Sequence, residues 1–220
     1  MAVPPLPELP LIHTRNYDVT SFIEARDRIR LRGSVRDDKP PGLYIEDDPE
    51  PLTIHHMIVE LSIQVPSMEI VDVDVVFDVH PHGRCPRIVE HYDELVGLSI
   101  ARGFTHRVRE LFGGPRGCTH TTALLQAMAP VAIQSMWSLR MHEARADGGG
   151  QPVAPPRPMS PEERKARMAG NLNTCHVWAE DGEMVAEIEA GAELEIPRWI
   201  IDRVRELGRD PDEWVSLMRG

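Results

Sequence analysis

The histidines of this chain fall in short groups, some of them with cysteines. The groups pair His55 with His56, His80 with His82, Cys118 with His120, and Cys175 with His176. An imidazole that is neutral near pH 7 serves as a general acid or base, and it is also a common metal ligand. Each group stands at the boundary of an expected helix or strand, where side chains can converge on a cleft. The spacing indicates acid–base or metal chemistry.

The segment GGPRGCTH (113–120) is the strongest local signal. It predicts a helix that begins at Cys118 or Thr119, with unpaired backbone N–H groups in its first turn. The partial positive charge there disfavours a protonated imidazole, so His120 is expected to stay neutral and available as a base or hydrogen-bond donor. Alternatively, Thr119 only caps the helix and Cys118 packs as a small apolar residue.

Two adjacent histidines open an expected strand over 55–65, so their side chains point to opposite faces of a sheet. His55 shares a face with Met57, Val59 and Leu61, which predicts that this face is covered. His55 is therefore the better candidate for a partly buried catalytic imidazole. The alternative is a core histidine whose hydrogen bonds are all satisfied.

A metal site is weakly indicated in the loop 80–86, where His80, His82 and Cys85 have a spacing that could ligate zinc. No second pair completes a four-ligand set unless the Cys-His pairs at 118–120 and 175–176 supply it. Asp78, at a strand end beside His80, is placed to orient an imidazole. No metal is assigned.

Familiar nucleotide and nucleophile motifs are absent from the sequence. There is no GxGxxG after a strand, no GxxxxGK[ST] and no GxSxG. Their absence does not affect the case for cofactor-free acid–base chemistry, because such chemistry needs only positioned histidine, carboxylate, lysine or tyrosine groups.

Composition excludes several classes of protein. The 220 residues carry a formal net charge of −11, and a general nucleic-acid binder needs a concentrated basic face. No apolar run reaches the length of a membrane span, and the start of the chain lacks the pattern of a secretory signal. We therefore expect a cytoplasmic protein with no nucleic-acid or membrane partner. Three cysteines suggest reduced thiols.

The periodicity predicts an α+β fold, an antiparallel sheet with helices packed on one side. Strands are expected at 28–35, 55–65 and 69–79, with a turn at 65–68, and helices at 88–96, 104–112 and from about 118 to 143. In the third strand, the alternation places one group on the covered face: Val71, Val73, Val75 and Phe77.

Four segments organise the chain. They are a proline-rich arm (1–12), a main α+β domain (13–146), a linker (147–160) and an extension packing on the main domain (161–220). The extension should hold a helix near 161–169, a weak pair of strands around 174–189 and a helix from about Pro197. The proline arm suggests a homo-oligomer.

Several motifs occur in the order found in a bacterial family known only as domain of unknown function number twenty-eight eighty-nine. They are HTR (13–15), RGSVRDDKP (32–40), IHHM (54–57), CP (85–86) followed by Tyr92, GFTHRVRELFGGPRGCTHTTALL (103–125) and NTCHVWAEDGEMV (173–185). The chain resembles this family over about 13–190. It departs where His56 replaces an aspartate and where Asp37, Asp38 and Lys39 stand for Asp-Thr-Lys.

The resemblance implies cofactor-independent lyase chemistry on lignin-derived aromatic compounds. A base, His55 or His120, would remove a hydroxyl proton from a small phenolic substrate, so that a carbon–carbon bond breaks and formaldehyde leaves. Lys39 would stabilise phenolate or alkoxide charge, while Asp78 and His176 would orient the bases. Substrate contacts are expected from a further set: His56, Cys118, Thr119 and Tyr92. A metal-assisted hydrolase and a non-catalytic oligomeric binding protein remain the alternatives.

Overall fold

The computed structural model describes residues 5–146, 160–192 and 197–211, and the chain divides into two compact units, Met1–Ala144 and Arg145–Gly220. The boundary at Ala144 falls close to the expected end of the main domain. Most of the expected linker, 147–159, lies outside the described residues. Packing of the extension on the main domain stays a prediction.

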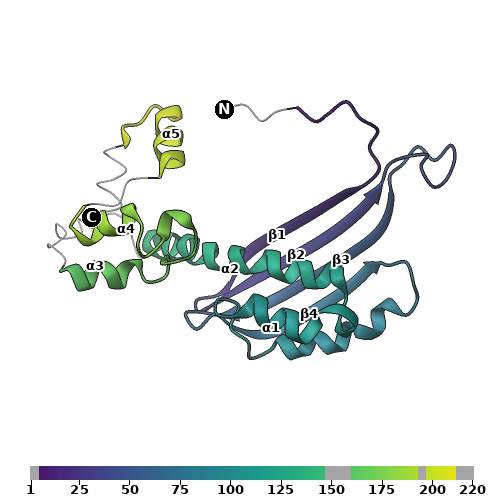
Figure 1. Cartoon of the computed structure of the whole chain (residues 1–220), viewed down its shortest axis with the longest axis horizontal. Helices are drawn as coiled ribbons and strands as arrows, with labels where there is room; N and C mark the ends of the chain where they lie inside the picture. Colours follow the sequence, from purple (N-terminus) through teal and green to yellow (C-terminus); the bar gives the residue numbers. More distant parts are fainter. Residues whose placement is uncertain (1–4, 147–159, 193–196, 212–220) are drawn as a thin grey trace. The chain divides into compact units, whose positions relative to one another are not determined.

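The first unit is built on one antiparallel sheet with strand order β1-β2-β3-β4 (Figure 1). Its strands are β1 Thr14–Ala25, β2 Arg28–Lys39, β3 Leu52–Gln64 and β4 Glu69–Val79. Three follow the expected segments, and the turn at 65–68 joins β3 to β4 as expected. Helices cover one face, so the predicted α+β fold is confirmed.

Strand β1 was not expected from the sequence. It stands at the edge of the sheet, where only Val19 and Ser21 along its middle are half-buried and most of its other side chains are exposed. An edge strand with little covered surface needs no apolar alternation. The sequence of residues 14–25 therefore lacks the signal that marks β2 and β3.

The covered face of β4 differs from the expectation in one position. Ile70 is fully buried whereas Val71 is exposed, and Val75 and Phe77 are buried as expected. The pairing of β3 with β4 shifts between Ser62 and Ile63, an irregularity that moves the start of β4 by one residue. Because side chains alternate with a period of two, such a shift exchanges the two faces.

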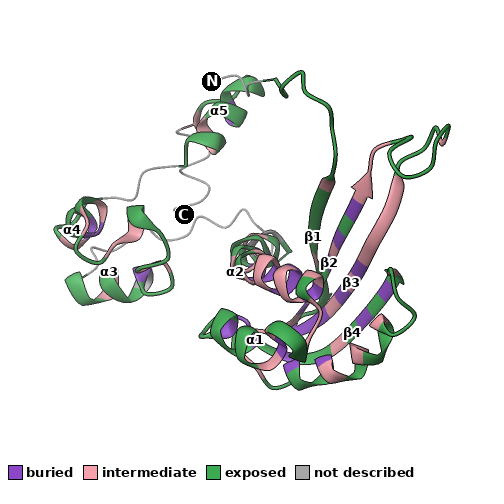
Figure 2. Ribbon diagram, turned by 45° about the vertical axis from the view of Figure 1, so that its right-hand side comes forward, coloured by how far each residue is buried: buried purple, intermediate pink, exposed green. Residues whose placement is uncertain are grey.

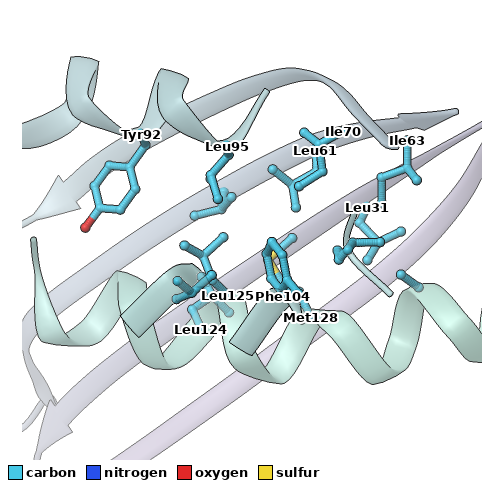
Figure 3. Close-up of a cluster of buried hydrophobic side chains, with 14 of the residues drawn as sticks. Leu31, Leu61, Ile63, Ile70, Tyr92, Leu95, Phe104, Leu124, Leu125 and Met128 are labelled. Atoms are coloured by element: carbon cyan, nitrogen blue, oxygen red, sulfur yellow. The ribbon is translucent and has the colours of Figure 1, made fainter. Parts of the chain in front are cut away.

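The helical elements of this unit are η1 Cys85–Leu95, α1 Phe104–Phe112, η2 Gly114–Arg116 and α2 Thr119–Ala146. The expected helix at 88–96 is a 3-10 helix that starts earlier, and the other two expected helices are present. Buried residues line the sheet-facing side of α2 at spacings of three and four (Figure 2). Leu124, Leu125 and Met128 contact the apolar face of β2 and β3 in the main core (Figure 3).

Close packing of α2 on β2 depends on Gly33. A Cβ atom added there would lie 2.7 Å from Sδ of Met128 and 3.1 Å from Cδ1 of Leu124. We expect Gly33→Ala to lower the free energy of unfolding by about 1–3 kcal/mol, because overpacking forces neighbours out of their rotamers. Chemical denaturation measures the change. Gly83→Ala is the control, since nothing lies within 4 Å of its added Cβ; equal stability of both variants would contradict this packing.

The described part of the second unit is helical. Its elements are α3 Pro161–Met168, η3 His176–Trp178, α4 Glu183–Glu189 and α5 Arg198–Glu206. The expected strands around 174–189 are wrong, because Val185 and Ile188 lie on one face of α4 and pack with Met168 of α3. The expected helices near 161–169 and from Pro197 are present. Within the described residues, no helix is long and apolar enough to cross a bilayer.

Candidate active site

A buried carboxylate lies at the centre of the candidate site. Asp37 continues the covered alternation of β2 after Leu31 and Val35, and it is only 1% exposed. A buried charge is costly unless it is paired and hydrogen-bonded. Side chains from two neighbouring strands and from α2 meet this demand.

Arg15 supplies the countercharge. It lies on β1 directly opposite Asp37, and its guanidinium donates from Nε to Oδ1 at 2.6 Å and from Nη2 to Oδ2 at 2.7 Å. These bonds lower the pKa of Asp37 from its ordinary 3.8 to about 2, although burial acts in the opposite direction. The pKa of Arg15 is raised by the same bonds. Asp37 is thus ionised across the physiological range.

His55 faces Asp37 from the other side, across the pairing of β2 with β3. Its side chain is 19% exposed, and Nδ1 lies 3.1 Å from Oδ2 of Asp37. An ionised carboxylate only accepts hydrogen bonds, so Nδ1 carries the proton and donates it. In the tautomer that carries its proton on Nδ1, the basic lone pair lies on Nε2. This is the arrangement in which a carboxylate orients a general base.

His120 reaches the same carboxylate from the first turn of α2. Its Nε2 lies 3.2 Å from Oδ2 of Asp37, and its ring stacks on that of His55 with centroids 3.9 Å apart. Burial lowers the pKa of His120, the neighbouring His55 and Arg15 act in the same direction, and the nearby Asp37 opposes them. His120 is therefore neutral at pH 7. The sequence indicated the same state, but from the helix terminus rather than from burial.

One residue before β1 completes the cluster. His13 lies at the end of the N-terminal arm with Nε2 3.5 Å from Oδ1 of Asp37. We call His13, Arg15, Asp37, His55 and His120 the His-Asp cluster. Sequence reasoning identified both strand and helix histidines but missed the other three residues. The available signal was an aspartate on the apolar face of a strand.

The start of α2 is held in place by Tyr92. This tyrosine of η1 is fully buried, and its hydroxyl accepts a hydrogen bond of 2.9 Å from the backbone N–H of Cys118. Cys118 in turn places Sγ 3.6 Å from Nδ1 of His120. Burial raises the pKa of Tyr92. Tyr92 has no exposed surface in this structure and positions His120, and its expected contact with substrate stays a prediction.

Residues 13–134 match the family model described as Protein of unknown function (DUF2889). The chain belongs to this family. The matched segment starts at His13 and contains the whole His-Asp cluster. No curated protein and no solved structure matches the chain. The DUF2889 family has no described function, so family membership does not assign a reaction to the site.

Asp78 does not lie with the other expected catalytic residues of this DUF2889 chain. It binds His56, whose Nδ1 is 2.8 Å from Oδ2 of Asp78, on the face of the sheet opposite to the helices. Consecutive strand residues face opposite sides, so His55 and His56 are separated by the sheet. Asp78 therefore orients His56 rather than His80 or the two bases. His56 is outside the cluster.

In the described part of the chain, three expected positions make no hydrogen bond with the cluster. The ammonium of Lys39 stands 5.6 Å from the ring centre of Tyr44. Thr119 is exposed on the first turn of α2. His176 is an exposed residue of the second unit, and its part in catalysis stays a prediction.

The candidate metal loop contains a contact between two of its own residues. Nδ1 of His80 lies 3.0 Å from the carbonyl oxygen of His82, an interaction within the loop. Among the described residues, ligand-type atoms gather instead at Asp37, His55 and His120, all within 4.8 Å of one another. If any residues of the first unit hold a metal ion, these three are the best placed.

Proposed function

We propose that this protein is a cofactor-independent carbon–carbon lyase that releases formaldehyde from a lignin-derived phenolic compound. One observation carries the proposal: two stacked imidazoles share one ionised, buried carboxylate. Such a group accepts and returns a proton without a metal or an organic cofactor. The reaction class comes from the resemblance described above.

His55 acts as the base in this proposal. Its Nε2 takes the proton of a substrate hydroxymethyl group, the carbon–carbon bond beside that group breaks, and formaldehyde leaves. The substrate reaches this step as a quinone methide, which forms when the phenol loses its proton and the benzylic carbon expels an oxygen substituent as water or an alcohol. The electron pair of the broken bond then forms a carbon–carbon double bond to the benzylic carbon and restores the aromatic phenolate. His55 then returns the proton, so nothing is oxidised or reduced overall. Asp37 stabilises the imidazolium that forms between the two steps.

Apolar side chains at the end of the sheet that holds the His-Asp cluster support an aromatic substrate. The loop that follows Lys39 carries exposed Leu43, Tyr44 and Ile45, and the arm carries exposed Ile12 immediately before His13. Apolar groups of this kind bind rings, and the ammonium of Lys39 offers a positive charge for a phenolate. The substrate would lie across this open surface. We also propose a cytoplasmic location and a homo-oligomeric state.

A metal-assisted hydrolase is the second candidate, favoured by the close ligand atoms of Asp37, His55 and His120. Arg15 already binds both oxygens of Asp37. A guanidinium beside the carboxylate repels a divalent cation and favours proton transfer. The two candidates differ in what a chelator does to them.

A substrate panel tests the proposal. Untagged protein is incubated with phenolic aromatic dimers that carry a hydroxymethyl group, and formaldehyde is measured with and without a chelator. We expect formaldehyde release that survives the chelator, with less than about 0.1 mole of metal per chain. Activity that disappears with the chelator and returns with zinc would favour the hydrolase candidate.

A further inference from the structure

The outer edge of β1 is unpaired in the structure. β1 is twelve residues long, stands last in the sheet and pairs only with β2. In residues 5–146, no backbone hydrogen bond joins its outer edge to another segment. The opposite edge is partly covered, because Ile70 of β4 exchanges backbone hydrogen bonds with Gly97 and Leu98. A long free edge invites pairing with another strand.

Exposed apolar side chains line this edge on both faces. Tyr17 and Ile23 lie on the helix side, 43% and 47% exposed, and Phe22 lies on the open side, 51% exposed. Proline and lysine, which protect natural edges, are absent from residues 14–25. The one irregularity lies at the far end, between Ile23 and Ala25. The central part is regular enough to accept a partner strand.

We propose that β1 pairs antiparallel with β1 of a second copy of this chain, with Thr20 facing Thr20 across a twofold axis. This surface is independent of the reaction proposed above. A twofold axis makes the interface self-complementary, because the same patch is used by both copies. The two sheets would join into one.

Charge and face matching select this register. A twofold axis normal to the sheet puts the helix sides of both copies on the same side of the joined sheet. Two residues that face each other across the axis are then both odd-numbered or both even-numbered, so the sum of their numbers is even and identifies the register. A sum of 36 opposes Asp18 to Asp18, and a sum of 42 opposes Asp18 to Glu24; like charges directly opposed destabilise a pair. Among the even sums that pair at least nine of the twelve residues of β1, 38 and 40 remain.

Side-chain pairing decides between the two remaining registers. With a sum of 40, Tyr17 faces Ile23 of the second copy. The twofold axis repeats this pair, so each copy's Tyr17 and Ile23 are both covered. The same register pairs Thr20 with Thr20, and both kinds of pair stabilise antiparallel sheets. With a sum of 38, Ile23 would instead oppose Arg15, whose guanidinium is held by Asp37. The pattern of β1 thus fits a second copy of itself in one register.

Disulfide cross-linking tests the surface and its register together. In the full chain, Thr20→Cys places two thiols on directly opposed residues, whose Cα atoms would be about 4.5–5.5 Å apart, within the reach of a disulfide. We expect a covalent dimer under mild oxidation, confirmed by mass spectrometry of the linked peptides. Val19→Cys and Phe22→Cys, which are offset in this register, are the matched controls. The wild type under the same oxidant reports on the native cysteines.

Solution measurements provide a second readout. Light scattering after size exclusion should give a dimer for the wild type. Thr20→Lys should raise the dimer dissociation constant at least about tenfold by opposing two ammonium groups, while the neutral Thr20→Gln should not. A wild type that is monomeric at every concentration, or cross-linking through Val19→Cys in place of Thr20→Cys, would overturn the proposal. Formaldehyde release measured on the same samples tests the reaction separately.

Discussion

Asp37→Asn is expected to lower kcat at least about a hundredfold, the largest effect of any single substitution in this site. The amide keeps the size of the side chain but cannot stabilise an imidazolium, and it can donate to Nδ1 of His55 and so select the wrong tautomer. Steady-state assays of formaldehyde release measure the loss. Asp38→Asn is the matched control, because Asp38 is the next residue of β2 and binds Arg36 and Thr53 instead.

The same substitution changes how stability depends on pH. The pKa of Asp37 falls from 3.8 to about 2 in the folded protein, so ionisation of this carboxylate stabilises the fold above pH 4 by about 2 kcal/mol. This contribution is lost as the pH falls through about 2. Denaturation at pH 7 and at low pH should show that Asp37→Asn has lost it. Equal activity of both aspartate variants would contradict the central role of Asp37.

Replacement of either imidazole is expected to produce the second large effect. His55→Gln and His120→Gln should each lower turnover at least about tenfold, since one removes the base and the other removes the ring stacked on it. Because the pKa of His120 is lowered by burial, this ring should remain neutral as the pH falls through its ordinary value of 6.5. A pH–rate profile of each variant measures the separate contributions.

A histidine outside the cluster serves as the control for these variants. His106 lies on α1 with its side chain 78% exposed, and His106→Gln should retain wild-type turnover. Full activity in both His55→Gln and His120→Gln would eliminate the imidazole mechanism. Loss of activity in all three variants would point to a general effect on folding.

Local periodicity was sufficient to predict part of the site. The alternation of Met57, Val59 and Leu61 shows which face of β3 is covered, and this places His55 on that face. The glycines before Cys118 likewise mark the start of α2 and with it His120. Both inferences use residues that are neighbours in sequence, where spacing determines direction.

The centre of the site required long-range pairing. Arg15 meets Asp37 only through the register of β1 with β2, and His55 meets it through the register of β2 with β3. Neither register follows from periodicity, and β1 itself lacks a strand signal because it is an edge. The shift after Ile70 and the helix at Glu183–Glu189 were missed for related reasons, since packing partners decide both.

The most direct test of the proposed chemistry compares a phenolic substrate with its para-methyl ether. The mechanism requires the free phenol, because the electron pair of the broken bond enters the para-phenol system. Formaldehyde and consumed substrate are measured for both compounds with the wild-type protein. We expect one formaldehyde for each phenol consumed and no turnover of the ether. Equal release from both compounds, or release from neither, would contradict it.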